Sequence, residues 1–482
     1  MRPLAPPAAT RPRRLHPMTV AVGALRELLG LLAAGAAGLV VGGLSTAFYF
    51  ALLGLAFGLL FHLAKWATFT YTLHDDRLEL RRALLGRSMK TIPRERVRGV
   101  DVNAPLAHRL FGLAIVQIDA GSEGGDGELR AVSRAEAERL RALLMTGDDA
   151  RPAADRQGSA VLARARPRWY LFAPLSGAYL LTPFALAGSL LGALYNLGDE
   201  LGLIDDRRLS ELGDDVAGWP RGVFVVFALV FLAAMPIASV VVFALFNWDF
   251  TLRSTGGGTA VAAERGLFTR RSVSLERRRI RGVELADNPL ERAAGVVRLS
   301  ALVTGLDDTA HRGRLLPASP RPVASAAASR VLGDRLPGPL IRHPPAARRR
   351  RIVRAAGPPL LLAALAVPAG RSWAVSLALA AALIAVPLGL DRYRQLGHAT
   401  DGTRLTVRSG SLRRRQAVVE HRAVVAWRLR RTLFQRRLGL ATLTVGVGAG
   451  EGAYPALDMG ESDAVAFAHG ITPEWIGPFL ED

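Results

Sequence analysis

Long uncharged runs alternate along this chain with segments in which polar and apolar residues mix at short intervals. The first run, Leu28 to Ala64, contains no charged residue, and a membrane-spanning helix needs about 20 apolar positions. Gly42-Gly43 offers a turn near the middle of this run, so we expect two helices there. Runs of the same kind cover 169–198, 222–248, 355–370 and 372–390. The pattern predicts about six transmembrane helices in three hairpins, at 24–64, 169–248 and 352–390.

Charge on the flanks of these runs sets the orientation that we expect. Residues 199–220, inside the second hairpin, hold seven acidic residues and two arginines. The N-terminal tail is basic, and Arg348–Arg351 precede the last hairpin. Because positive loops stay inside, both termini and the three long polar segments are expected to be cytoplasmic. The alternative, a cleaved signal peptide, does not fit the length of the first apolar run.

Composition narrows the class of protein further. The 482 residues include 62 Lys+Arg against 41 Asp+Glu, for a formal net charge of +21, and no Cys. Without Cys there are no disulfides, thiolate zinc sites, iron–sulfur clusters or cysteine nucleophiles. Lys65 and Lys90 are the only lysines, which excludes a P-loop. These features favour a basic membrane protein that is not an enzyme.

A short motif recurs after each predicted hairpin and indicates internal repeats. Its consensus is L-x(1–2)-R-x-x-G-[LV], followed by an alternating apolar strand. The arginines and glycines of the motif are Arg109 and Gly112, Arg292 and Gly295, and Arg436 and Gly439. We expect them to be structural, and contact between these arginines and a ligand is the alternative. An R-G-V step precedes the motif in the first two repeats, whereas the third has Val424-Val425-Ala426-Trp427.

Short strands separated by turn residues fill each repeat, which is typical of a small antiparallel sheet or barrel. A capping box at Ser133–Glu136 begins a helix that closes the first repeat. Each module is therefore expected to be β-rich with a C-terminal helix. The predicted division of the chain is a basic tail 1–23, hairpin 24–64, module 65–145, linker 146–168, hairpin 169–248 with an acidic outside loop 199–220, module 249–335, basic linker 336–351, hairpin 352–390 and module 391–482.

Three stretches of the first repeat carry a family likeness. They are Tyr71-Thr-Leu-His-Asp-Asp-Arg-Leu, Ile92-Pro93 with Val97-Arg98-Gly99-Val100, and Pro105-Leu106 with Arg109 and Gly112. With the order of hairpins and modules, they make the chain resemble the YdbT-like bacterial pleckstrin-homology (PH) membrane proteins over nearly its whole length. The resemblance implies three PH-like modules, a bacterial cell-membrane location and no established reaction. Members are at most linked to tolerance of membrane-active peptides. The second and third repeats depart from the pattern at residues 255–258 and 401–403, which puts a ligand site shared by all three in doubt.

Arginine clusters in the second module are the candidate lipid-binding or partner-binding residues. They are Arg270, Arg271, Arg277, Arg278, Arg279 and Arg281. A basic side chain near an anionic leaflet contributes about 1 kcal/mol to membrane binding. The alternative that the sequence leaves open is that these arginines only set topology and keep the segment soluble.

The sequence contains no catalytic constellation and no cofactor motif. The nine His are scattered without metal-ligand spacing, so we expect neither metal nor cofactor. Nucleic acid is not expected, because no recognition element accompanies the basic charge. The favoured hypothesis is a non-enzymatic scaffold whose modules bind membrane lipids, anionic ones included, peptides or another membrane protein. The alternative is a transport or efflux component giving tolerance to toxic peptides. The apolar runs lack the internal charged residues that such a pathway normally needs.

Overall fold

The computed structural model describes residues 12–22, 46–83, 87–97, 99–120, 127–145, 160–200, 210, 215–304 and 313–480. Residues 24–45 of the first predicted hairpin, most of the linker 146–168 and most of the acidic loop lie outside the described residues. The chain divides into two compact units, Met1–Glu276 and Arg277–Asp482. The boundary falls inside the second repeat, so each unit contains one and a half repeats.

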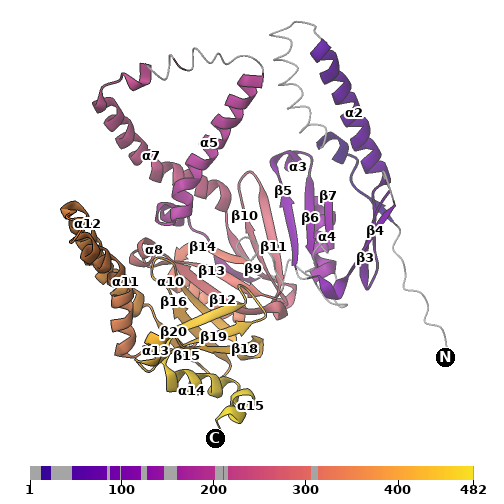
Figure 1. Ribbon diagram of the computed structural model, residues 1–482. Coiled ribbons are helices and arrows are strands. Elements are labelled where there is room, and N and C mark those ends of the chain that lie inside the picture. Colours follow the sequence, from indigo (N-terminus) through magenta and orange to yellow (C-terminus); the bar gives the residue numbers. More distant parts are fainter. Residues whose placement is uncertain are drawn as a thin grey trace, which may run out of the picture. The chain divides into compact units, whose positions relative to one another are not determined.

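The first unit is built on two antiparallel sheets (Figure 1). One has the order β1-β2-β3-β4, formed by Arg13–Arg14, Thr70–Leu73, Arg77–Arg82 and Ser88–Pro93. The other has the order β7-β6-β5-β11-β10-β9-β8. Its strands, from β5 to β11, are Gly99–Ala104, Leu113–Asp119, Gly127–Ser133, Ala160–Arg164, Thr251–Thr255, Ala260–Arg265 and Arg270–Glu276.

The core of the first unit lies between these two sheets. Leu78, Leu80 and Ile92 of the small sheet pack with Val116 and Ile118 of the large one. The helix α4, Arg134–Met145, adds Ala137, Leu140 and Leu144 to the same cluster. The first repeat is therefore two facing sheets closed by a C-terminal helix, as the alternating apolar pattern requires.

The second unit repeats this design. A six-stranded sheet has the order β14-β13-β12-β17-β16-β15, and a three-stranded sheet the order β18-β19-β20. The strands, from β12 to β20, are Ile280–Asp287, Val296–Val303, Arg314–Pro320, Gly397–Thr400, Arg404–Ser409, Arg414–Glu420, Val424–Arg430, Leu440–Val447 and Ala453–Gly460. The helices α10, Arg321–Leu332, and α14, Glu461–Ile471, follow the last strands of the second and third repeats.

Neighbouring repeats are joined by strand pairing, which the sequence did not predict. In the first unit β5 of the first repeat pairs with β11 of the second, with Ala104 opposite Arg270. In the second unit β12 of the second repeat pairs with β17 of the third, with Asp287 opposite Arg414. We expected each module to form a sheet of its own. Pairing across repeats is favoured over separate sheets because it covers edge strands that would otherwise expose unpaired backbone groups.

Glycine makes the second junction possible. A Cβ atom at Gly282 would lie 2.3 Å from the carbonyl oxygen of Val418 on the partner strand. At Gly99, the matching position of the first junction, it would lie 3.3 Å from the carbonyl oxygen of Ser274. The R-G-V step of the first two repeats therefore supplies a residue without a side chain where the next repeat comes close.

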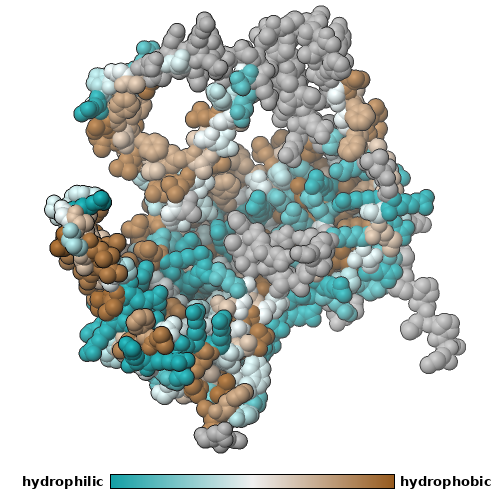
Figure 2. All heavy atoms as spheres, in the orientation of Figure 1, coloured by the Kyte–Doolittle hydropathy of each residue, from teal (hydrophilic) through white to brown (hydrophobic). Residues whose placement is uncertain are grey.

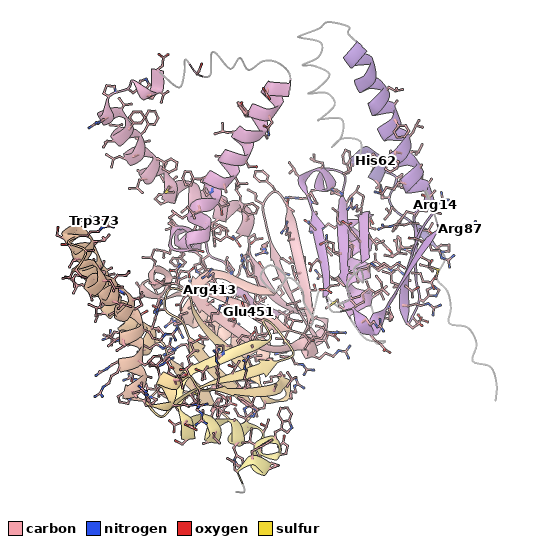
Figure 3. The ribbon with its side chains drawn as sticks, viewed as in Figure 1. Arg14, His62, Arg87, Trp373, Arg413 and Glu451 are labelled. Atoms are coloured by element: carbon pink, nitrogen blue, oxygen red, sulfur yellow. The ribbon has the colours of Figure 1, made fainter. Side chains whose placement is uncertain are left out.

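Five long helices carry most of the apolar runs: α2, Thr46–Thr68; α5, Gly177–Glu200; α7, Arg221–Asn247; α11, Pro345–Ala366; and α12, Ser372–Arg394. Brown, hydrophobic side chains cover much of α7 and of the α11–α12 pair (Figure 2). Gly389 of α12 packs tightly against α11, because a Cβ atom there would lie 2.8 Å from the Cα atom of Ile352. Trp373, at the tip of this pair (Figure 3), is exposed.

The prediction of six transmembrane helices in three hairpins is wrong. Among the described residues, two helices are long and apolar enough to cross a membrane, α7 and α12. A third span results only if the segments 167–175 and 179–196, bent by 80° relative to each other, count as one. The predicted fifth span fails because α11 begins at Pro345 and includes Arg348–Arg351, which leaves only residues 355–366 apolar. Twelve helical residues rise about 18 Å, against about 30 Å of hydrocarbon.

Candidate membrane-proximal surface

The repeated motif folds into a single helical turn in each repeat: α3, Leu106–Leu110; α8, Pro289–Ala293; and α13, Leu433–Arg436. Asn288 and Thr432 form capping boxes at the starts of α8 and α13. The motif glycines follow these helices with φ values of 66° for Gly112, 68° for Gly295 and 61° for Gly439. Positive φ explains why the motif carries glycine there.

The motif arginine of the first repeat ties α3 to the end of a candidate span. Arg109 donates from Nη1 to the carbonyl oxygen of Leu267, in the turn between β10 and β11. The backbone N–H of Leu267 donates in turn to the carbonyl oxygen of Leu245, in the last turn of α7, at 3.1 Å. The short helix α3 is therefore held next to the C-terminal end of α7.

The motif arginine of the second repeat makes the corresponding contact with α12. Arg292 donates from Nη1 to both carboxylate oxygens of Asp391, each at 3.1 Å. It also donates to the carbonyl oxygen of Ser411, which occupies the same place in the β16–β17 turn as Leu267 does in the β10–β11 turn. The short helix α8 thus lies beside the end of the second candidate span.

In the third repeat a different residue takes over this role. Arg436 is exposed, whereas Gln435 is buried and donates from Nε2 to Asp458 at 2.8 Å. The carboxylate of Asp458, fully buried in β20, also forms ion pairs with Arg350 and Arg351 of α11, the second at 2.6 Å. The arginine run that we interpreted as topology charge therefore helps to anchor α11, and with it α13.

Each of the three helices leaves a leucine exposed. The exposed fractions are 51% for Leu106, 60% for Leu290 and 74% for Leu433. Phe434, next to Leu433, is 72% exposed. In each unit, exposed large apolar side chains beside the end of a long apolar helix are typical of a surface that contacts lipid or a partner.

Positive charge exceeds negative charge beside the end of α12. Asp287 is buried and receives Arg414 at 3.0 Å and Arg292 at 3.4 Å. Burial, with the charges of Arg414 and Arg321, lowers the pKa of Arg408 to about 10. Burial and Arg414 also lower the pKa of Arg321. Both shifts come first from burial, and the neighbouring arginines add to them.

The structure separates the arginines that the sequence grouped together. Arg270 and Arg271 are exposed at the start of β11, directly after the turn that contacts α7. Arg277, Arg278 and Arg279 form a 3-10 turn after the far end of that strand, and Arg281 lies in β12. Arg277 donates from Nε to the carbonyl oxygen of Val331 at 2.8 Å and so caps α10. These residues belong to different units, and only Arg270 and Arg271 lie beside a candidate span.

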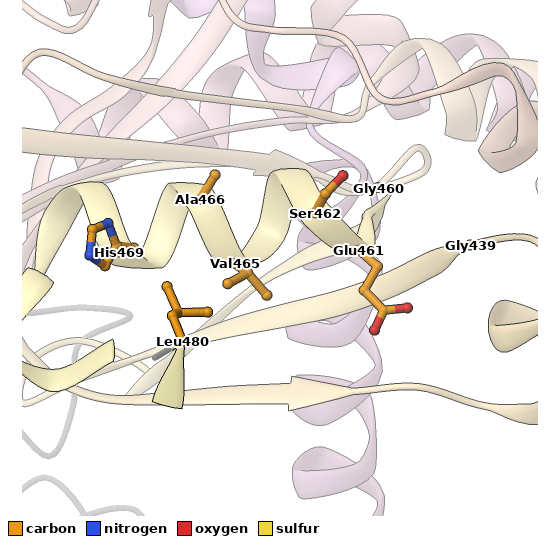
Figure 4. Close-up of a pocket in the computed structure, with 8 residues that line it drawn as sticks. All are labelled: Gly439, Gly460, Glu461, Ser462, Val465, Ala466, His469 and Leu480. Atoms are coloured by element: carbon orange, nitrogen blue, oxygen red, sulfur yellow. The ribbon is translucent and has the colours of Figure 1, made fainter. Parts of the chain in front are cut away.

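An open pocket of about 790 Å³ lies against α14 (Figure 4). Val465, Ala466 and Leu480 supply an apolar lining, while Glu461, Ser462 and His469 are spread along the helix. Glu461 is already paired with Arg431. Because its polar groups do not converge, the pocket has no evident chemistry of its own. In the described part of the chain no group of three His, Asp or Glu could hold a metal ion.

Sequence reasoning missed the anchors Asp391, Gln435 and Asp458, because no local pattern marks a carboxylate or amide whose partners are 23 to 108 residues away. It favoured a structural role for the motif arginines, with ligand contact as the alternative, and did not connect them with the ends of the apolar helices. The exposed Leu433 and Phe434 could have been found, since arginines flank them closely on both sides.

Comparison with known protein families gives one match. The model of the bacterial PH domain matches residues 24–147, 203–334 and 358–471. PH-like domains are in general non-catalytic modules that bind lipids or proteins. No curated protein and no solved structure matches the chain.

Proposed function

We propose, from the premise that this chain belongs to the bacterial PH domain family, that it is a non-enzymatic scaffold anchored in the bacterial cell membrane. Its PH-like repeats lie on the cytoplasmic face and bind anionic lipid headgroups there, which leaves other surfaces for protein partners. Its anchors are the candidate spans α7 and α12. The observation that carries the proposal is the placement of the motif helices at the ends of apolar helices.

Two contacts support this placement most directly. The turn that receives Arg109 is hydrogen-bonded to the last turn of α7. Arg292 is paired with Asp391, directly after the apolar part of α12. If α7 and α12 cross the bilayer, α3 and α8 lie within the headgroup layer or next to it. The adjacent arginines then meet lipid phosphates rather than bulk water.

Anchoring is tested first, with the full chain expressed in bacteria. We expect the protein in the membrane fraction and resistant to extraction with alkaline carbonate, as integral proteins are. Recovery of the chain in the supernatant after that wash would refute the anchoring part of the proposal.

Lipid preference is tested next by matched removal of charge. Arg270→Gln with Arg271→Gln removes two exposed cations beside α7, and Arg278→Gln with Arg279→Gln removes two cations from the far end of the strand. Retention of phosphatidylglycerol by the detergent-solubilised full chain is followed by native mass spectrometry, with phosphatidylcholine for comparison. At about 1 kcal/mol for each cation, the first pair should weaken retention roughly 30-fold and the second should not. Equal effects would show that only net charge matters.

A further inference from the structure

The last repeat exposes the strand edge through which the first two repeats bind their successors. β5 and β12 each pair with the third strand of the following repeat, in the same register. β18 is the matching strand of the third repeat, and its sheet has the order β18-β19-β20. Among the described residues no strand pairs with its outer edge. We call β18 and α13, with Arg437 and Leu438, the terminal surface.

The terminal surface is not suited to a fourth repeat. Pairing with β19 places Ala426 where Gly282 stands in β12. A Cβ atom at that glycine would lie 2.3 Å from the carbonyl oxygen of the incoming strand. In β18 this atom is present, so the close approach seen at the second junction is blocked.

Charge at the terminal surface is reversed relative to the second junction. In the second junction Asp287 forms an ion pair with Arg414 of the next repeat and a longer one with Arg321. At the matching positions of the third repeat stand Arg431 and Glu461, which form an ion pair with the signs exchanged. Glu284 is likewise replaced by Arg428. The third strands of the second and third repeats begin with Arg270-Arg271 and Arg414-Arg415, and that of the first repeat contains Lys90. Another copy of this chain would therefore meet like charge.

One leucine that is covered in the second junction is exposed here. Leu429 is 44% exposed, whereas Leu285 at the matching position of β12 is 3% exposed. Leu433 and Phe434 are more exposed still. Residues 428–438 contain five arginines and no acidic residue. Exposed leucine and phenylalanine ringed by arginine are typical of segments that lie in the interface of an anionic membrane.

The terminal surface also lies close to where the apolar part of α11 begins, as contact with lipid headgroups requires. Gln435 of α13 and Arg350 of α11 share the carboxylate of Asp458. The apolar part of α11 begins at Ala355, five residues on, which is a rise of about 7.5 Å. The headgroup layer on each side of a bilayer is about 5–7 Å thick. With α11 and α12 packed as a pair, α13 is held next to this layer.

We infer that the terminal surface docks on an anionic bilayer surface, with Leu433 and Phe434 inserted between headgroups and Arg428, Arg430, Arg436 and Arg437 against lipid phosphates. The inference rests on the proposed membrane anchoring. It adds that the third repeat binds lipid through the surface that joins the first two repeats to their successors. Each arginine near an anionic leaflet favours the contact by about fivefold.

The chain contains no Cys, so a single introduced thiol can report on this contact. Phe434→Cys in the full chain is labelled with an environment-sensitive fluorophore and reconstituted into phosphatidylcholine vesicles with or without phosphatidylglycerol. Phe479→Cys, in the same unit and 84% exposed, is the matched control. Quenching by spin-labelled lipid reports insertion, and quenching by iodide reports exposure to water.

We expect the label at position 434 to be quenched by lipid in vesicles with phosphatidylglycerol, and the label at 479 to be quenched by iodide. The effect at 434 should fall several-fold when Arg428, Arg430, Arg436 and Arg437 are all changed to Gln. Iodide quenching at 434 equal to that at 479, in vesicles that still carry the chain on flotation, would overturn the inference while leaving the anchoring intact. Protection from both quenchers would also overturn it and indicate a protein partner. Failure of the chain to float would refute the proposed anchoring itself.

Discussion

Replacing Asp458 with Asn tests whether the buried ion cluster holds α11 and α13 to the third repeat. The carboxylate is fully buried and pairs with Arg351 at 2.6 Å, with Gln435 at 2.8 Å and with Arg350. Asp458 has a φ of 58°, a conformation that Asn tolerates better than most residues. Asp458→Asn therefore removes the charge and leaves shape and backbone nearly unchanged.

The expected cost follows from leaving two guanidinium groups without their carboxylate. Breaking a buried ion pair by removing one partner costs about 3–5 kcal/mol. Since 1.4 kcal/mol is a factor of ten, local opening of β20 should become roughly 10² to 4 × 10³ times more frequent. Hydrogen exchange of peptides from β20 and α13, followed by mass spectrometry in the detergent-solubilised full chain, measures that opening directly.

A compensating variant separates lost charge from lost packing. When Arg350→Gln and Arg351→Gln are combined with Asp458→Asn, no unpaired charge remains, and buried pairs can often be replaced by neutral groups at little cost. Exchange of β20 in this triple variant should be slower than in Asp458→Asn alone. An Asp458→Asn chain whose exchange stays within about fivefold of the unchanged protein, or about 1 kcal/mol, would refute the reasoning.

Three further predictions concern other parts of the fold. Burial lowers the pKa of His398 to about 4, so its contribution to stability should be full above the usual value near 6.5 and decline as the pH falls toward 4. Thermal unfolding at a series of pH values should show this slope. His398→Gln should reduce the slope without abolishing it, because burial also lowers the pKa of the neighbouring His343. Gly282→Ala should open the pairing of β12 with β17, because its Cβ atom would meet the carbonyl oxygen of Val418. Gly112→Ala, with open space around it, should cost only the roughly 1–2 kcal/mol of a positive φ. Hydrogen exchange in the affected strands distinguishes the two variants. Arg292→Gln should lower the unfolding free energy by about 1.5–3 kcal/mol, which is the contribution of a hydrogen bond to a charged group. Arg436→Gln, at the exposed matching position, should change the unfolding free energy by no more than about 0.5 kcal/mol. Denaturant titration measures both.

Much of the repeat architecture could be predicted from sequence, because it depends on local pattern. Alternating apolar residues predicted the strands, and the recurring arginine and glycine predicted three matching units. Pairing of β5 with β11 could not be predicted, because it joins residues such as Val100 and Ser274 across most of two repeats. Nothing in either strand alone marks which edge it will cover.

The number of spans was overestimated for a related reason. Uncharged runs were counted without knowing where each helix begins, and α11 begins ahead of Arg348. The candidate arginines were grouped because they are close in sequence. Arg271 and Arg277 nevertheless fall at opposite ends of one strand and in different units. A strand of seven residues separates its ends by about 20 Å.

The pairing between repeats links the order of synthesis to the order of assembly. β5 leaves the ribosome long before β11, and both apolar helices α5 and α7 are made in between. At about 5–20 residues per second, the edge of β5 stays open on the order of 10–30 s. During that time α5 and α7 are synthesised before the strand that covers β5 can follow. The seven-stranded sheet that begins with the first repeat is therefore completed only after both apolar helices have left the ribosome.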